Sequence, residues 1–267
     1  MGSAGLTYEA LNNLVVWQQM PAITLDEMRG VKLMNRIDTK YVLSEGEVLM
    51  LLDSLRHEGY KVQVIGDVRA CRYDTLYYDT TARDMYIAHH NQQLTRQKIR
   101  TRTYLESDTT FLEIKNKTNR GRTKKRRVEI AHEELYCFEH NAAAMTFFGE
   151  NARYAHSAIS PALATRFVRI TLVNPRLTER LTIDLMLSYE DVRSGRTATI
   201  PRMAIVELKQ DGNTLSVAKR IMRDMRIQPL KVSKYCLGTT LTVDGIKHNR
   251  FKEKIREIHK RLSTLTH

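Results

Sequence analysis

Residues 96–102, Arg-Gln-Lys-Ile-Arg-Thr-Arg, place a basic side chain at every second position, and residues 113–117, Glu-Ile-Lys-Asn-Lys, repeat the alternation. A third row follows at Arg122, Lys124 and Arg126. Side chains of an extended strand project alternately to opposite faces, so each row points one way. The stretch therefore predicts neighbouring strands with three cationic rows on one sheet face, a surface suited to a polyanion.

The positive charge is concentrated in this region. Residues 95–127 hold 12 Lys and Arg against 3 Asp and Glu, so +9 of the net +13 lies there. Ordinary surfaces intersperse both signs, whereas charge of one sign raises the potential of a cleft and attracts anions. An exposed basic hairpin is the alternative interpretation.

Composition sets the class of protein. The 267 residues are 42% hydrophobic and 27% charged, which is typical of a globular chain with a substantial core. We see no linker or internal repeat and expect a helical arm over residues 1–31, a single main domain over 32–240, and a C-terminal helix within 241–267 that packs on it.

The three cysteines, Cys71, Cys137 and Cys236, are widely spread and show no CxxC or Cys/His ligand spacing. This argues against a disulfide framework or a zinc site and favours a reducing compartment. We find neither a signal peptide nor a run of about 18 apolar residues, so we expect a soluble, cytoplasmic protein. Charge alone leaves nucleic acid, acidic lipid and polyphosphate open as partners.

The order of elements indicates an antiparallel sheet. Ser44 and Glu47 form a capping box that predicts a helix to about Gly59. Alternation and β-branched content predict strands at 33–43, 60–65, 70–78, 94–106, 110–117, 122–130, 162–173, 180–189 and 198–209. Further helices are expected at 8–20, 24–30, 81–90, 132–148, 152–157, 215–225 and 251–262. Closure removes the edges of such a sheet, so we expect an α+β fold with an antiparallel β-barrel and helices packed outside.

Charged residues inside this barrel need an explanation. Small barrels fill their interiors with apolar side chains, and a buried unpaired cation costs several kcal/mol. A cationic lumen must therefore hold water or ligand. Glu113, Asp184 and Glu207 are candidate inward carboxylates that either pair with cations or hold a divalent metal, and Mn or Mg suits oxygen ligands. Glu207, in an otherwise apolar strand, is the first choice as ligand, with a salt bridge as the alternative.

Familiar catalytic motifs are missing. The sequence contains no GxxxxGK[ST], GxGxxG, HExxH or GxSxG pattern. Few aromatic residues interleave the basic rows, so the base stacking that single-strand binders use is poorly supported, and we expect no nucleic acid partner.

Taken together, several segments resemble the VTC domain, the polyphosphate polymerase branch of the triphosphate tunnel metalloenzyme (CYTH-like) superfamily. The resemblance spans about residues 32–238. It rests on six stretches, which are Arg36-Ile37-Asp38-Thr39-Lys40-Tyr41, Leu76-Tyr77-Tyr78-Asp79-Thr80, Lys98-Ile99-Arg100-Thr101-Arg102, Phe111-Leu112-Glu113-Ile114-Lys115, Ala204-Ile205-Val206-Glu207-Leu208-Lys209 and Val232-Ser233-Lys234-Tyr235.

The resemblance implies an ATP-dependent polymerase inside an antiparallel β-tunnel, with Glu207 at the family's metal-binding glutamate. It also implies phosphate contacts from Lys40, Arg100, Arg102, Lys115, Arg169, Lys231, Ser233 and Lys234. The other superfamily branches begin with ExExK, where this chain has Arg36, Asp38 and Lys40. This departure favours the VTC branch over the hydrolases.

A second departure is Phe167-Val168-Arg169, where the family has Tyr-x-Arg. The phenol contact to phosphate is lost and the charge of Arg169 is kept. Arg166 lies close enough to take the place of Arg169 after a short slip in the alignment.

The predicted reaction is attack of the terminal phosphate of a growing polyphosphate chain on the γ-phosphorus of ATP, releasing ADP. Arg100, Arg102 and Lys115 would grip the triphosphate, Glu207 would position Mn or Mg, and Lys40, Lys231 and Lys234 would hold the acceptor. Phosphoryl transfer depends mainly on alignment and charge neutralisation, which a cationic tunnel supplies. A hydrolase of inorganic or nucleoside triphosphate and a non-catalytic polyanion-binding module remain alternatives. A separately encoded membrane partner would also fit, and the sequence does not specify the oligomeric state.

Overall fold

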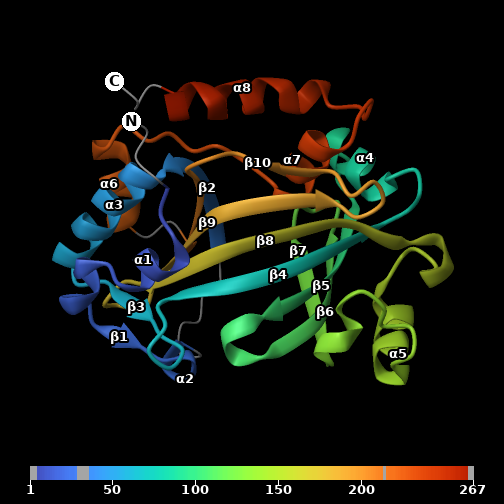
Figure 1. The fold of residues 1–267 in the computed structure, drawn as a ribbon, viewed down its shortest axis with the longest axis horizontal. Coiled ribbons are helices and arrows are strands. Elements are labelled where there is room, and N and C mark those ends of the chain that lie inside the picture. Colours follow the sequence, from blue (N-terminus) through green and yellow to red (C-terminus); the bar gives the residue numbers. More distant parts are fainter. Residues whose placement is uncertain (1–4, 29–35, 213–214, 264–267) are drawn as a thin grey trace.

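An eleven-stranded, strongly curved sheet organises the computed structural model, which describes residues 5–28, 36–212 and 215–263 (Figure 1). The strands are β1 (Ala22–Ile23), β2 (Arg36–Ser44), β3 (Lys61–Gln63), β4 (Ala70–Asp79), β5 (Arg96–Tyr104), β6 (Thr109–Lys117), β7 (Thr123–Ile130), β8 (Ser160–Val173), β9 (Glu179–Asp191), β10 (Thr197–Thr199) and β11 (Met203–Asp211). Their main order is β2-β11-β9-β8-β4-β5-β6-β7, with every neighbour antiparallel. The predicted antiparallel sheet is confirmed.

The sheet curls without closing completely. Within the described ranges, no hydrogen-bonded ladder joins β2 to β7, the two ends of the main order. β7 carries four consecutive basic residues, Lys124 to Arg127, all of them exposed. Charged side chains at a sheet edge oppose pairing with another strand. The barrel expected from the sequence is therefore open along this seam.

The helices lie against the outside and one end of the sheet. The α-helices are α1 (Tyr8–Asn12), α2 (Leu25–Met28), α3 (Glu45–His57), α4 (Asp84–His90), α5 (Ala142–Asn151), α6 (Val217–Asp224), α7 (Lys234–Thr242) and α8 (Asn249–Ser263). Short 3₁₀ turns are η1 (Val15–Gln18), η2 (Leu105–Ser107), η3 (His132–Leu135) and η4 (His156–Ala158). Among these described helices, none combines the length and apolar character needed to cross a bilayer.

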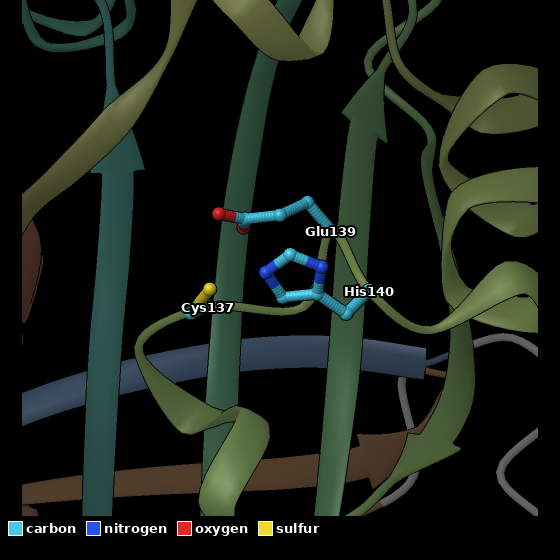
Figure 2. A group of neighbouring side chains, drawn as sticks. All are labelled: Cys137, Glu139 and His140. Atoms are coloured by element: carbon cyan, nitrogen blue, oxygen red, sulfur yellow. The ribbon is translucent and has the colours of Figure 1, made fainter.

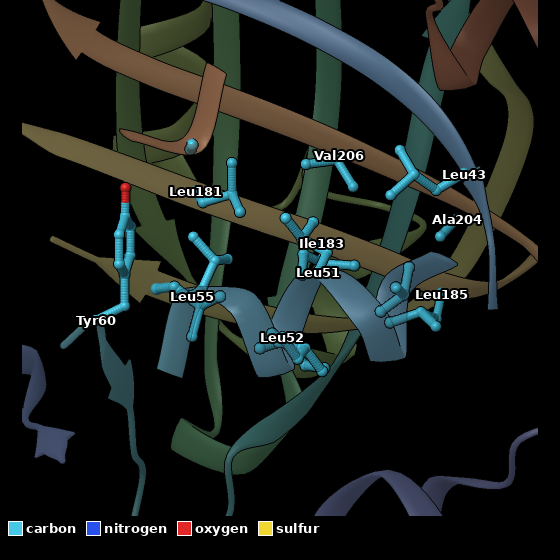
Figure 3. Close-up of a cluster of buried hydrophobic side chains, with 14 of the residues drawn as sticks. Leu43, Leu51, Leu52, Leu55, Tyr60, Leu181, Ile183, Leu185, Ala204 and Val206 are labelled. Carbon is cyan, nitrogen blue, oxygen red and sulfur yellow. The ribbon is translucent and has the colours of Figure 1, made fainter. Parts of the chain in front are cut away.

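The largest hydrophobic cluster forms where α3 covers one outer patch of the sheet (Figure 3). Leu51, Leu52 and Leu55 of α3 are fully buried against Ile183 of β9 and Val206 of β11. Ser44 accepts from the amide of Glu47, and the Glu47 carboxylate accepts in return, so the predicted capping box starts the helix. Burying leucines of this size contributes about 1.5–3 kcal/mol each.

Two further large clusters lie elsewhere on the sheet, and a small one joins Ile23, Met28 and Val173. The first lies on the outer face of β5 and β6, where η3 and α5 cover Ile99, Leu112 and Ile114. The second lies at one end of the opposite face, where α7 packs against β8 and β9 and α8 packs against β2, with Tyr235 and Ile258 among the buried residues. The middle of the face opposite the α5 side of the sheet carries charged residues.

Several local predictions differ from the structure. Residues 132–148 form η3 and α5 with a loop between them, since Asn141 caps a new helix by accepting from the amide of Ala144. Pro201 and Arg202, the latter with positive φ, divide the expected strand at 198–209 into β10 and β11. The expected helix at 152–157 is replaced by η4. Residues 29–35, within an expected helix and strand, lie outside the described residues.

Candidate active site on the inner face of the sheet

The strand register assigns the charged side chains to one face. Lys40 of β2 lies opposite Glu207 of β11, and Arg100 of β5 lies opposite Glu113 of β6. Directly paired residues of antiparallel strands share a face. We call this surface the inner face; its central charged residues are Lys40, Lys98, Arg100, Arg102, Glu113, Lys115, Arg169, Asp184, Glu207 and Lys209, joined by Lys234 from α7.

The register corrects the third basic row. Lys125 pairs with Lys115, and Arg127 pairs with Glu113, so these two residues of β7 share the inner face. Lys124 and Arg126 therefore point outward, where they line a hollow of about 200 Å³ beside α5. The interpretation of Arg122, Lys124 and Arg126 as an inward row was wrong, because four consecutive cations fit either phase of the alternation.

The register also distinguishes Arg166 from Arg169. Arg169 pairs with Asp184 on the inner face, while a bulge in β8 and β9 separates this pair from the pairing of Arg166 with Ser188. The Arg166 side chain, 48% exposed, contacts Asp74 and Glu190 on the outer face. Arg169 is the arginine that lies among the other predicted phosphate contacts.

Two of the inner-face carboxylates are bound to guanidinium groups. Glu113 accepts from Arg100 Nε at 2.6 Å and also contacts Lys125. Asp184 accepts from Arg169 Nε at 2.6 Å and from Nη2 at 2.8 Å, and contacts Lys234. Their side chains are 0% and 2% exposed. These carboxylates hold the cations in place and have little capacity left for a ligand.

Glu207 is different. Its side chain is 20% exposed and lies 3.8 Å from Lys40 Nζ and 3.4 Å from Lys209 Nζ, and it accepts no hydrogen bond from the described residues. Although burial opposes ionisation, the two ammonium groups hold the pKa of Glu207 well below its usual range. An ionised carboxylate that solvent can reach fits a hard divalent cation such as Mn or Mg, whose remaining ligands can come from phosphate and water.

Some cations have no carboxylate partner. Lys115 makes no hydrogen bond and no ion pair within 4 Å in the described part of the chain, and the charge of Arg100 together with burial lowers its pKa strongly. Arg102, 5% exposed, donates from Nε to Thr75 Oγ1 at 2.9 Å, and neither Nη group has a described partner. An incoming anion can neutralise the charge of Arg102, and it would favour the protonated, charged form of Lys115.

The start of α7 adds a further edge to the site. Ser233 caps the helix by accepting from the Cys236 amide, and it also accepts from Lys98 Nζ at 2.9 Å. Lys40 Nζ donates to the Val232 carbonyl at 3.3 Å. Ser233 therefore caps α7 and also bonds one of the inner-face lysines. Lys231 is exposed at the rim. Burial lowers the pKa of the nearby Lys117, and the positive charges of Arg96 and Lys231 lower it further.

Two of the stretches that resemble the VTC domain are in direct contact. Asp79, fully buried, accepts from the amides of Met85 and Tyr86 at 3.0 Å and so caps the start of α4. The Tyr235 hydroxyl donates to the same carboxylate. This bond ties the first turn of α7, including Lys234, to the end of β4. The two stretches therefore also have a positioning role.

Aromatic rings lie between the cations, contrary to the expectation from the basic rows alone. The rings of Tyr73 and Phe167 stack at 5.1 Å, and Arg102 and Arg169 lie over both. The rings come from β4 and β8, neighbours of the basic strands in space only. Guanidinium groups cover them, and such contacts favour the charged form of Arg.

The sequence analysis missed four of the described inner-face cations. Lys125 and Arg127 were assigned to the wrong face, Arg180 of β9 lies opposite Lys209, and Lys209 itself was quoted in a motif without a role. Lys209 lies two residues after Glu207 and therefore on the same face of β11. Once β9 is known to pair with β11, Arg180 is identified as its direct neighbour. Burial lowers the pKa of Lys209 to about 8.

The chain is similar to a known domain family and to several solved structures. The sequence model described as the VTC domain matches residues 35–243. No curated protein matches the chain. Similar solved structures include putative adenylate cyclases from Vibrio parahaemolyticus (10% identity, TM-score 0.45, covering 77% of this chain and 99% of that one) and Bacillus halodurans (12%, 0.48, 75% and 96%). A Hippeastrum protein described as a putative adenylyl cyclase with a dominant triphosphatase activity is 14% identical, with a TM-score of 0.48, and covers 80% of this chain and 100% of its own.

Proposed function

Because this chain belongs to the VTC domain family, we propose that it is a metal-dependent polyphosphate polymerase that transfers the γ-phosphate of ATP to a growing polyphosphate chain. The observation that supports this most directly is that the central inner-face carboxylates differ in how far cations occupy their oxygens. Glu113 and Asp184 are bound to arginines, whereas Glu207 is accessible and free of hydrogen bonds from described residues.

In the proposed reaction, Arg102 and Lys115 bind the triphosphate of ATP, since both lack a described carboxylate partner. Arg100 and Arg169, fixed by Glu113 and Asp184, present their remaining N–H groups in a set orientation. Rigid donors cost no reorganisation when charge develops on the transferred group. These four residues are thus proposed to align the phosphates and to neutralise their charge.

The acceptor end is assigned to the rim at α7. Lys40, Lys231 and Lys234 are proposed to hold the growing chain, and Ser233 can donate its hydroxyl proton while it accepts from Lys98. The attacking phosphate oxygen is already ionised near neutral pH, so the residues need not supply a general base. A divalent metal ion bound by Glu207 would supply further charge neutralisation on phosphate oxygens.

Product analysis tests the proposal. Purified protein is incubated with ATP and Mn²⁺, and ADP, free phosphate and polymer are resolved. We expect polymer with ADP, lost in Glu207→Gln and Arg102→Ala. Glu190→Gln, which changes an exposed outer-face pair with Arg166, is the matched control and should retain activity. Free phosphate without polymer would replace the proposal with a triphosphatase. Absence of turnover, with tripolyphosphate bound equally by wild type and Glu207→Gln, would indicate a binding module.

A further inference from the structure

A second group of chemically reactive side chains lies outside the proposed active site, on the loop between η3 and α5. Cys137, Glu139 and His140 turn toward one another, and one ligand atom from each lies within 4.8 Å of the others (Figure 2). His156 of η4 extends the group, with its Nε2 atom 3.9 Å from Glu139 Oε2. The donors are therefore one sulfur, one carboxylate oxygen and two imidazole nitrogens.

The loop that carries these residues is anchored on both sides. Phe138, between Cys137 and Glu139, is fully buried, and its ring contacts the rings of Tyr78 at 5.3 Å and His156 at 5.1 Å. The Leu135 carbonyl accepts from the Tyr78 hydroxyl at 3.1 Å. These contacts fix the backbone, while Glu139 and His140 stay exposed to solvent. Donors held on a fixed backbone lose less freedom when they bind an ion.

We propose that Cys137, Glu139, His140 and His156 form a zinc site that fastens the loop to η4. Zinc prefers sulfur and nitrogen donors in a four-coordinate arrangement and accepts carboxylate oxygen. Tetrahedral ligand atoms at zinc distances are about 3.5 Å apart, so the ligand atoms of Cys137, Glu139 and His140, which lie within 4.8 Å of one another, must approach by about 1 Å. Mn and Mg prefer oxygen ligands, which separates this site from Glu207.

Binding replaces one proton. The Cys137 thiol loses its proton to the buffer, its sulfur becomes a thiolate, and a sulfur–zinc bond forms; no oxidation occurs.

The sequence alone argued against a zinc site because it contains no pair of closely spaced cysteines. One cysteine with a glutamate and a histidine two and three residues later is a weak pattern. The fourth donor, His156, is separated from them by α5 and is brought near only by the packing of Phe138 and Phe148.

Cobalt titration of the metal-free full-length chain tests the proposal. We expect one equivalent of Co²⁺ to give a thiolate-to-cobalt charge-transfer band and tetrahedral visible absorption, both removed by one equivalent of Zn²⁺. Cys137→Ser should abolish the charge-transfer band, and His140→Ala should weaken Co²⁺ binding by about 100-fold or more. Because His140 is exposed and Cys137→Ser exchanges only the sulfur of a half-buried side chain for oxygen, both variants should fold normally, which circular dichroism checks.

Two controls locate the ion. His132→Ala changes an exposed histidine of the same region and should leave Co²⁺ binding unchanged. Glu207→Gln should also leave it unchanged, and excess Mg²⁺ should not displace Co²⁺. Absence of the charge-transfer band in wild type, or its persistence in Cys137→Ser, would overturn the site. Since the readout is absorption, this result is independent of whether the protein makes polyphosphate.

Discussion

Replacing Glu113 by glutamine should strongly destabilise the free protein. The Glu113 side chain is fully buried and bonds Arg100 at 2.6 Å and Lys125, so Glu113→Gln leaves two cations without their carboxylate. Removing one partner of a buried ion pair costs about 3–5 kcal/mol. For a chain of this size, each kcal/mol corresponds to roughly 2–4 °C, so we expect the unfolding midpoint to fall by about 6–20 °C.

The same argument predicts that an anion restores much of the loss. Tripolyphosphate brings negative charge to the cations that Glu113→Gln exposes, and a ligand that binds only the folded state stabilises it. The increase in unfolding midpoint caused by saturating tripolyphosphate should therefore be larger in the variant than in wild type. Differential scanning fluorimetry with and without the anion measures both effects.

A matched variant isolates the effect of burial. Glu190→Gln removes a carboxylate whose pair with Arg166 is on the outer face, with side chains 33% and 48% exposed. Exposed pairs contribute about 0–1 kcal/mol, so this variant should unfold within a few degrees of wild type. If Glu113→Gln were equally stable, or if tripolyphosphate stabilised both proteins alike, the inner face would not hold the unbalanced charge that the proposal requires.

Three further predictions follow from local geometry. Burial lowers the pKa of Lys209 and Lys234 to about 8, and bound phosphate must raise both pKa values because it favours the charged lysines. Tripolyphosphate affinity should therefore fall as pH rises above 8 and the lysines of the free protein lose their protons, by up to about tenfold per lysine per pH unit. Calorimetry against pH checks this, and Lys234→Arg should flatten the profile; an affinity independent of pH would contradict it. Gly238→Ala should cost about 1–3 kcal/mol, since an added Cβ would lie 2.5 Å from the Tyr189 ring, and a denaturation midpoint equal to wild type would contradict that packing. Ser44→Ala should cost about 0.5–2 kcal/mol through loss of the α3 cap, measured by urea unfolding, and no loss would mean that tertiary contacts alone hold the helix start.

The inward-facing residues of a strand could be predicted from sequence where only every second residue was charged. In β5, Gln97 and Ile99 separate the basic residues, so the inward row could be read directly, and the register with β6 confirms it. In β7 the run from Lys124 to Arg127 is charged in both phases. Only the hairpin register, set by the turn in which Gly121 has positive φ, decides which cations face inward.

The sequence analysis singled out residues 232–235 as a motif but did not predict the helix α7 that begins there. Ser233 offers a cap, but its N3 position is Cys236, which cannot complete a capping box. The helix is buried on nearly every side, so it lacks the polar face that normally identifies a helix in a sequence. Its position is fixed by a long-range bond, from Tyr235 to Asp79, that no local pattern specifies.

The roles of Glu113, Asp184 and Glu207 could not be assigned from sequence for a related reason. Glu113 and Glu207 occupy similar strands, each with a lysine two residues later. What separates them is the strand opposite: Glu113 faces an arginine, which can donate two parallel hydrogen bonds, whereas Glu207 faces Lys40, which remains 3.8 Å away. A guanidinium group that donates two hydrogen bonds occupies the oxygens of a carboxylate. A more distant ammonium group lowers the pKa of the carboxylate and leaves its oxygens available. If this reasoning is right, Lys40→Arg should saturate Glu207 in the same way, and Mn²⁺-dependent turnover should fall although the net charge of the inner face is unchanged.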